Sequence, residues 1–297
     1  MGDVLRFSLI MPTLNRTDDV RRFMNALNEQ TFRDLELIVV DQAATDELST
    51  VLEPFRASFP INHIRTGKPL GAAAARNLGA AQATGELIGF PDDDCYYDPD
   101  YLRRVSRLME QHADWDGVTG GVVGLEHYYA RQIGAVKRHR VWWQVVEFNL
   151  FVRRPVFERV GPMDPTIGPG AKTPWGAGEA ADWALSALEA GKFLQYLPDL
   201  LVHHPGPLTN PRDDRAEARC VFGYSVGKAH VLRKHGFGFP FAGYLAMRPL
   251  YGVIRSLLLG RPGKAKISWA VSRGIMHGWR LSAAQAPSDH DMVVHSA

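Results

Sequence analysis

The chain has 297 residues, 45% of them hydrophobic and 22% charged, which allows one large globular domain or a domain with an appendage and argues against wholesale disorder. Its two cysteines, Cys95 and Cys220, exclude a disulfide framework and a cysteine-based zinc cluster, and they fit a reducing compartment. The net charge is +2, but residues 218–288 hold eleven Lys/Arg and no Asp or Glu, so the rest of the chain carries −9. This basic segment predicts an anionic partner, either a membrane surface or nucleic acid.

The N-terminal part of the chain alternates between apolar runs and helical patterns. It begins without a signal-peptide pattern, and no stretch reaches the roughly 18 uncharged apolar residues of a membrane span. Short apolar runs at 7–11, 35–40, 61–64 and 87–90 predict strands. Helices are predicted from Thr17, as an N-cap, to Leu27 and over the small residues 71–81. This alternation predicts an α/β fold with a mostly parallel central sheet flanked by helices on both faces.

Three consecutive aspartates, Asp92, Asp93 and Asp94, directly follow the run 87–90. Open α/β sheets bind ligands at the carboxyl ends of their strands. Because side chains alternate along an extended segment, we expect Asp92 and Asp94 to point one way and Asp93 the other. An Asp-x-Asp pair can hold a divalent cation together with a nucleotide. A solvated acidic turn is the alternative, which the position after a buried strand disfavours.

Thr13 lies in the loop 12–16 that is predicted to leave the first strand, and Asp41 ends the second strand, so we expect both at the same edge of the sheet. Asp41 could accept a hydrogen bond from a base N–H or a ribose hydroxyl, or it could simply initiate a turn. The sequence lacks Gly-x-Gly-x-x-Gly after the first strand and has no Gly-x-x-x-x-Gly-Lys-Ser/Thr motif. A dinucleotide-dependent dehydrogenase and a P-loop enzyme therefore both lose support.

Four motifs in this part of the chain resemble, in order and spacing, the family-2 inverting glycosyltransferases of the GT-A fold. They are Pro12-Thr13-x-Asn15-Arg16, Leu37-Ile38-Val39-Val40-Asp41, Gly71-x-x-x-Ala75-Arg76-Asn77-x-Gly79 and Gly85-Glu86-x-Ile88-x-Phe90-x-Asp92-Asp93-Asp94. The resemblance implies a single GT-A-type domain that binds a nucleotide diphospho-sugar with Mn²⁺ or Mg²⁺. It further implies nucleotide binding by Pro12, Thr13, Asn15, Arg16, Asp41, Arg76, Asp92 and Asp93, and metal binding by Asp94. The family often has an acidic residue after the position of Asp41, where this chain has Gln42.

Further along the chain, the sequence predicts a helix at 99–112 and a strand at 118–124. Residues 149–164 extend the resemblance. A glycine-rich loop at 168–178, with an exposed-looking Trp175 that we expect to contact the acceptor, then leads into a predicted helix at 179–190. Carboxylates in a first helical turn are kept ionised by the helix dipole, as a general base requires. The matching family segment usually has its base where this chain has Ala180, so we predict Glu179 as the base and Asp182 as an acceptor contact or supporting carboxylate. Ordinary helix N-terminal charges are the alternative.

Two histidines follow a strand-like pair at 193–197 and 200–205. Neutral imidazole is a good ligand for manganese-like ions, and the resemblance allows a histidine here to complete the metal or diphosphate site. We put forward His204, with His203 as the other candidate. A purely structural histidine is equally compatible with the sequence.

The basic segment predicts helices. Tyr244, Met247, Tyr251, Ile254 and Leu258 alternate spacings of three and four around Pro249, which predicts one apolar helix face. Further on, Lys266, Arg273 and Arg280 form a basic stripe with Trp269 and Trp279 nearby. Such helices suit an anionic membrane surface, or they pack on the body and expose a basic face. Nucleic acid is disfavoured because no recognised binding motif accompanies the charge.

We therefore predict a nucleotide-sugar-binding half at 1–115, an acceptor and catalytic-base half at 116–217, a basic helical extension at 218–282 and a flexible tail at 283–297. The predicted function is metal-dependent inverting transfer of a sugar to a hydroxyl of a glycan or lipid-linked acceptor. We expect it in surface polysaccharide assembly, in the cytoplasm at the inner membrane face. The alternatives are a sugar-phosphate nucleotidyltransferase, whose Gly-Thr-Arg-type loop is missing, and a non-catalytic nucleotide-sugar-binding protein, which Ala180 would fit.

Overall fold

The computed structural model describes residues 6–126, 128–205 and 213–284, which form two compact units. Within this part of the chain, an α/β unit consists of residues up to 172 together with 179–205. A helical unit consists of residues 173–178 and 213–284. Of the predicted flexible tail, residues 285–297 lie outside the described residues.

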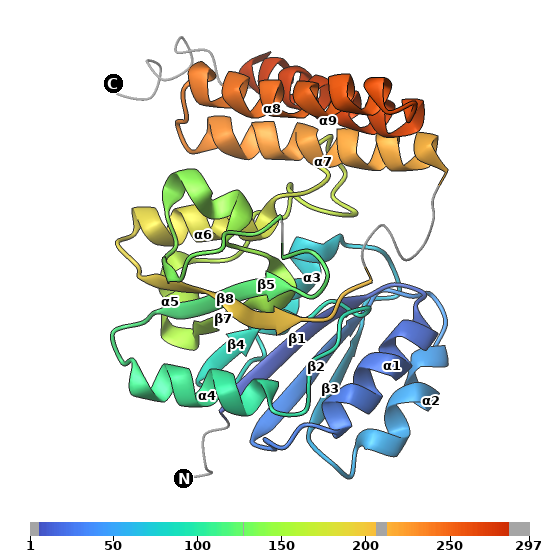
Figure 1. Cartoon of the computed structure of the whole chain (residues 1–297). Helices are drawn as coiled ribbons and strands as arrows, with labels where there is room; N and C mark the ends of the chain where they lie inside the picture. Colours follow the sequence, from blue (N-terminus) through green and yellow to red (C-terminus); the bar gives the residue numbers. More distant parts are fainter. Residues whose placement is uncertain (1–5, 127, 206–212, 285–297) are drawn as a thin grey trace, which may run out of the picture. The chain divides into compact units, whose positions relative to one another are not determined.

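The α/β unit is built on an eight-stranded sheet with the order β3-β2-β1-β4-β7-β5-β8-β6 (Figure 1). Its strands are β1 (Phe7–Thr13), β2 (Leu35–Asp41), β3 (Ile61–Arg65), β4 (Leu87–Gly89), β5 (Gly117–Val122), β6 (Gly134–Ala135), β7 (Leu150–Arg153) and β8 (Leu194–Val202). Six strands run parallel to one another, and β7 and the edge strand β6 run against them. The predicted mostly parallel sheet is confirmed.

Helices cover both faces of this sheet, as expected. The α/β unit contains α1 (Thr17–Asn28), α2 (Glu47–Leu52), α3 (Ala72–Ala80), α4 (Tyr101–Gln111), α5 (Arg154–Val160) and α6 (Glu179–Glu189). Short 3₁₀ helices span Glu53–Phe55, Arg138–Trp143 and Glu147–Asn149. Leu9 and Leu37 belong to a core shared with α1, α2 and α4. Their neighbours Ile10 and Ile38 face α3 instead, because side chains alternate along a strand.

The small residues of α3 bring it close to the sheet. A Cβ atom on Gly79 would lie 2.4 Å from Cγ2 of Ile10, which is a severe clash. The glycine therefore lets the helix backbone approach the β1 side chains directly. This close approach fixes the height of α3 above the sheet, and with it the position of Arg76.

Three local predictions were wrong. Pro12 and Thr13 belong to β1 rather than to a loop, and Pro12 is tolerated there because the β1–β4 pairing ends at Leu9. Thr17 is the first residue of α1, whose N-cap is Arg16 without a side-chain hydrogen bond. The strand-like pair after α6 is one continuous strand, β8, with an irregularity in its pairing with β5 that Asn149 stabilises by donating to the carbonyl of Leu200.

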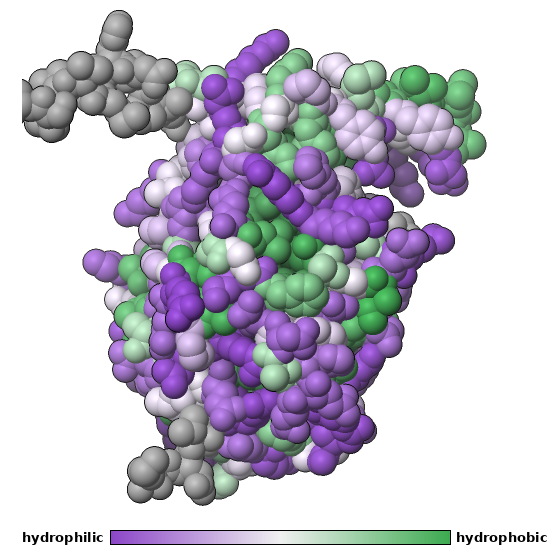
Figure 2. All heavy atoms as spheres, turned by 90° about the vertical axis from the view of Figure 1, so that its left-hand side faces the viewer, coloured by the Kyte–Doolittle hydropathy of each residue, from purple (hydrophilic) through white to green (hydrophobic). Residues whose placement is uncertain are grey.

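The helical unit contains α7 (Asp214–Lys234), α8 (Phe239–Leu258, with Pro249 inside it) and α9 (Pro262–Ala284). Gly274 and Gly278 of α9 pack directly on α7, where a Cβ atom would lie within 2.6 Å of the α7 backbone. Hydrophobic side chains also appear on the surface of this unit, shown in green in Figure 2. No helix in the described ranges has the length and apolar character needed to cross a membrane.

Candidate functional site

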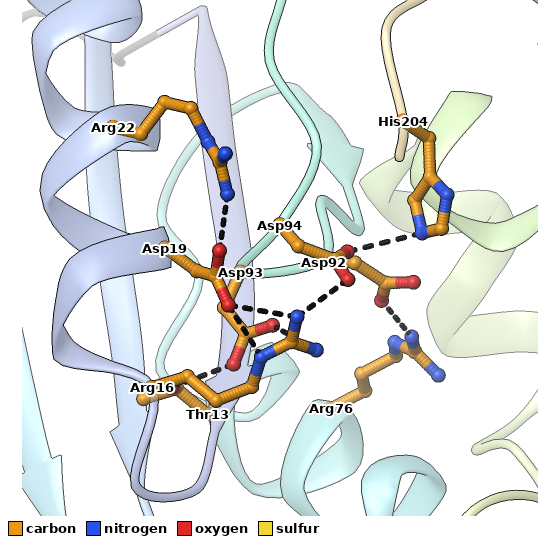
Figure 3. Close-up of polar contacts among 9 residues, drawn as sticks. All are labelled: Thr13, Arg16, Asp19, Arg22, Arg76, Asp92, Asp93, Asp94 and His204. Atoms are coloured by element: carbon orange, nitrogen blue, oxygen red, sulfur yellow. Dashed lines mark hydrogen bonds and ion pairs between the residues drawn. The ribbon is translucent and has the colours of Figure 1, made fainter. Parts of the chain in front are cut away.

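The three aspartates after β4 contact different partners, and Asp92 and Asp94 lie together as predicted (Figure 3). The predicted extended segment is not formed, because the backbone turns here and the N–H of Cys95 donates to the carbonyl of Asp92. Asp93 turns toward β1, where its Oδ2 accepts a hydrogen bond of 2.8 Å from the Thr13 hydroxyl. Asp92 accepts a hydrogen bond of 2.5 Å from Nη2 of Arg76. Asp94 forms ion pairs of 2.7 Å with Nη2 of Arg16 and of 3.0 Å with Nε2 of His204. The triplet therefore connects β1, α3 and the segment after β8.

Charge and burial separate the protonation behaviour of neighbouring aspartates. Burial raises the pKa of Asp93 to about 7, although Arg16 and the Thr13 hydroxyl oppose the rise. Burial acts in the same direction on Asp94, but His204 and then Arg16 outweigh it and lower the pKa of Asp94 to about 2. Burial would lower the pKa of His204, and its hydrogen bond and attraction to Asp94 raise it instead. Asp94 is therefore a carboxylate throughout the physiological pH range.

The residues Asp92, Asp94 and His204 make a chemically suitable cation site. One ligand atom from each side chain lies within 4.8 Å of the others. Two carboxylates and an imidazole suit a manganese-like ion. The structure also distinguishes the two predicted histidines, because Nε2 of His203 lies 2.9 Å from Asp98 while His204 joins the cluster. The residues present thus fit the divalent metal that the sequence predicts.

A pocket of about 220 Å³ opens beside the triplet. Four of the predicted nucleotide-binding residues line it, namely Thr13, Asn15, Arg16 and Asp41. The remaining lining residues are Thr17, Ala43, Thr45, Glu47 and Leu48. Pro12, in contrast, is buried within β1 and is absent from the pocket wall. The carboxyl ends of β1 and β2 therefore form a recess of the kind that open α/β sheets use for ligands.

Asp41 at the base of this pocket is held in place by its neighbours. Its Oδ1 accepts a hydrogen bond of 2.9 Å from the backbone N–H of Ala43, and its Oδ2 lies 3.2 Å from Nε2 of His63. The adjacent Gln42 accepts hydrogen bonds from the backbone N–H groups of Leu70 and Gly71. Gln42 therefore has a structural role, because it holds the start of α3 in place. In the family that the sequence resembles, this position often carries an acidic residue.

Arg76 of α3 connects the aspartates with the predicted base. It is only 2% exposed, and its Nη1 donates a hydrogen bond of 3.0 Å to Oε1 of Glu179 while Nη2 contacts Asp92. Glu179 is the first residue of α6 and is itself 2% exposed. One guanidinium thus bridges a carboxylate from the nucleotide side to the predicted catalytic carboxylate. The sequence predicted Arg76 for the diphosphate region, and its contact with Glu179 was not foreseen.

The remaining predicted residues differ in their surroundings. Asp182 lies on α6 beyond Glu179 and is buried. The expectation that Trp175 is exposed is wrong, because it is buried and stacks on His230 of α7 at 4.0 Å. This stacking occupies one face of the indole, so Trp175 does not present an open ring to an acceptor in this conformation.

Sequence reasoning missed Glu147, which lies just before β7. Burial raises the pKa of Glu147 to about 8, and the negative charges of Glu179 and Asp92 add to the rise. Because β7 runs opposite to its neighbours, its start lies at the edge where β4 and β5 end. Glu147 is therefore a third carboxyl group beside the Arg76 guanidinium. A rule that looks only at the carboxyl ends of strands does not find it.

A model of the family Glycosyl transferase family 2 matches residues 8–154, the segment that carries β1 to β7. This segment of the chain belongs to the family. The aspartates after β4 lie within the matched segment, whereas Glu179 and His204 lie beyond its end.

The relatives of known name are glycosyltransferases. Glycosyltransferase AglE from Haloferax volcanii is 27% identical over 209 residues, covering 67% of this chain and 66% of that protein. A PGL/p-HBAD biosynthesis glycosyltransferase from Mycobacterium bovis is 32% identical over 162 residues, or 52% and 62% of the two chains. The matches thus span about two thirds of the length of these relatives, or slightly less.

Two solved structures share the fold. Residues 1–349 of TarS from Staphylococcus aureus superpose with a TM-score of 0.59 at 16% identity, covering 92% of this chain and 91% of that one. The mannosyltransferase PcManGT from Pyrobaculum calidifontis, solved with GDP-Man and Mn²⁺, gives a TM-score of 0.62 at 18% identity over 98% and 79% of the chains. The GT-A-type fold is confirmed.

Proposed function

We propose that this protein transfers a sugar, with inversion, from a nucleotide diphospho-sugar to a hydroxyl group of a glycan or lipid-linked acceptor. The observation that carries the proposal is the chain of contacts Asp94–His204, Asp92–Arg76 and Arg76–Glu179 beside the pocket lined by Thr13 and Asp41. It places a cation site, a recess at the carboxyl ends of β1 and β2 and a carboxylate close to one another. An inverting transfer uses these three components together.

The donor is held, in this proposal, in the pocket beside β1 and β2. Asp41 and Thr13 face the nucleoside, and Arg16 and Arg76 provide positive charge for the diphosphate. Asp92, Asp94 and His204 would hold Mn²⁺ or Mg²⁺, which neutralises charge that develops on a departing diphosphate. Support for this donor class comes from related folds, since TarS has been solved with UDP-GlcNAc and PcManGT with GDP-Man and Mn²⁺.

Glu179 is the proposed general base. The incoming hydroxyl loses its proton as its oxygen attacks the anomeric carbon, and a carboxylate within hydrogen-bond reach accepts that proton. Arg76 orients the Glu179 carboxylate through the 3.0 Å hydrogen bond. Asp182, on the same helix, is proposed as a supporting carboxylate or acceptor contact. Trp175 has no direct acceptor role in this scheme, since it stacks on His230.

The proposed pathway is the assembly of a surface polysaccharide or a related glycoconjugate. The names of two relatives support it, one being a PGL/p-HBAD biosynthesis glycosyltransferase and the other a poly(ribitol-phosphate) β-N-acetylglucosaminyltransferase. Acceptor-binding loops vary between enzymes that share a scaffold, so the class of acceptor is proposed from these names rather than from the fold.

The test is calorimetric binding of UDP, GDP, dTDP and CDP, each with and without Mn²⁺, to the wild type and to Asp94→Asn. We expect one nucleotide class to bind with a requirement for the metal, and the variant to lose that requirement together with most of the affinity. Binding that is equally strong without metal and in Asp94→Asn would contradict the proposed cation site.

Turnover of the donor tests the base. Glu179→Gln should lower the rate of transfer by about 10²- to 10⁴-fold while nucleotide binding stays intact. Glu189→Gln, at the exposed end of the same helix, is the matched control and should leave the rate unchanged. Near-normal transfer by Glu179→Gln would refute the assignment. Nucleotide binding without turnover of any donor in the wild type would favour the non-catalytic alternative.

A further inference from the structure

The α8 helix carries an apolar face that the described residues of the helical unit leave uncovered. Its members are spaced by three and four residues and are 54–83% exposed: Tyr244, Met247, Tyr251, Ile254 and Leu258. The opposite side of α8 supplies the contacts within the helical unit, through residues such as Ala242 and Leu245 that are buried. The periodicity seen in the sequence therefore belongs to the outer face of α8, where large apolar side chains are normally scarce.

Positive charge lies along one side of this apolar face and beyond its C-terminal end. Arg248 and Arg255 lie on α8 itself, each one turn from a member of the face, and both are exposed. Arg261, Lys264 and Lys266 follow at the turn into α9 and are exposed as well. No acidic residue occurs in α8 or α9. The face is thus apolar, with cations along one side and at its C-terminal end.

We propose that this face of α8, defined by Tyr244, Met247, Tyr251, Ile254 and Leu258, docks in the plane of an anionic lipid bilayer. A helix with an apolar face and basic flanks inserts its apolar side chains at the level of the acyl chains while its cations contact anionic headgroups. Tyrosine suits this depth because its ring is apolar and its hydroxyl stays hydrated. The helix lies on the membrane rather than crossing it, since no described helix is apolar enough to span one.

Charge complementarity favours lipid over a second copy of the chain. Two such faces meeting symmetrically would place Arg248 and Arg255 of one copy near the same cations of the other, with no acidic side chain of α8 or α9 to compensate them. An anionic bilayer supplies the missing negative charge. Docking here is independent of the proposed transfer reaction, because it involves neither the nucleotide pocket nor Glu179.

The test is co-sedimentation of the full chain with phosphatidylcholine vesicles that contain or lack phosphatidylglycerol. We expect binding to the anionic vesicles, and weaker binding to neutral vesicles or in high salt. Ile254→Ser combined with Leu258→Ser should weaken binding by at least about tenfold, because two large apolar side chains no longer enter the bilayer. Arg248→Gln combined with Arg255→Gln should weaken binding to anionic vesicles by at least about tenfold as well.

Matched controls distinguish binding through this face from non-specific binding through any exposed apolar side chain. Ile133→Ser removes an isoleucine of the α/β unit that is 65% exposed, compared with 60% for Ile254, and should leave vesicle binding unchanged. The far-ultraviolet circular dichroism of the same variants, which reports the helices of the helical unit, should also be unchanged and shows that each one is folded. Equal binding by all variants, or no binding to anionic vesicles, overturns the proposal. A dimer that Ile254→Ser dissociates, without vesicle binding by the wild type, would assign the face to a second copy instead.

Discussion

Replacing Arg76 by methionine removes the charge that bridges Asp92 and Glu179 while keeping an unbranched side chain. The guanidinium is 2% exposed and lies 3.0 Å from Oε1 of Glu179, which is also 2% exposed. Breaking a buried ion pair from one side costs about 3–5 kcal/mol, because the remaining charge stays buried without its partner. We therefore expect Arg76→Met to lower the free energy of unfolding by about 3 kcal/mol or more.

Urea denaturation followed by far-ultraviolet circular dichroism measures this loss, and hydrogen exchange of peptides from α6 assigns it to the α/β unit. Adding Glu179→Gln to Arg76→Met should cost little more, because the second substitution removes the stranded charge. The control is Arg22→Met, which breaks an exposed ion pair with Asp19 and should cost about 1 kcal/mol or less. A loss below about 1 kcal/mol for Arg76→Met, or fully additive costs in the double variant, would refute the bridging role.

Two further predictions concern the histidine pair and the helical unit. His204→Ala, or chelation of the metal by EDTA, should weaken nucleotide binding by at least about tenfold in calorimetry, whereas the adjacent His203→Ala should change it little. Equal effects of the two alanine variants would contradict the assignment of His204. Burial and the nearby Arg248 lower the pKa of Lys228 to about 8, so above that pH the unfolded chain holds a proton that the folded chain has lost. The free energy of unfolding should therefore rise between about pH 8 and 10, by at most about 3 kcal/mol. In thermal melts, Lys228→Met should abolish the contribution of Lys228 to this rise. An identical pH profile in the variant would contradict the burial of Lys228.

The strands and the edge at which the site forms follow from local patterns. Short apolar runs predicted β1, β2 and β4, and the polar residues that follow them share one edge because the strands are parallel. These features depend on neighbouring residues only, so one sequence suffices to predict them. The aspartates themselves lie in a turn after β4, and Asp93 and Asp94 both pair with Arg16, so the predicted alternation along an extended segment does not explain their orientations.

Features that depend on contacts between distant segments were not predictable. Trp175 is buried because His230, far along the chain, stacks on it, and no local pattern at 168–178 reports that contact. Glu147 enters the site because β7 is inserted against the direction of β4 and β5. The spacing of apolar residues in α8 likewise does not show whether its apolar face contacts protein or solvent, because the spacing is the same in both cases.

Gly168 packs directly on the Glu179 carboxylate and so forms part of its cover. A Cβ atom on Gly168 would lie 2.8 Å from Cδ of Glu179, and Gly168 has a positive φ. An acceptor hydroxyl can give its proton only to an oxygen that it can reach, and Glu179 is 2% exposed, so the proposed reaction requires this cover to open. The rate at which the carboxylate becomes accessible then sets an upper limit on the turnover rate.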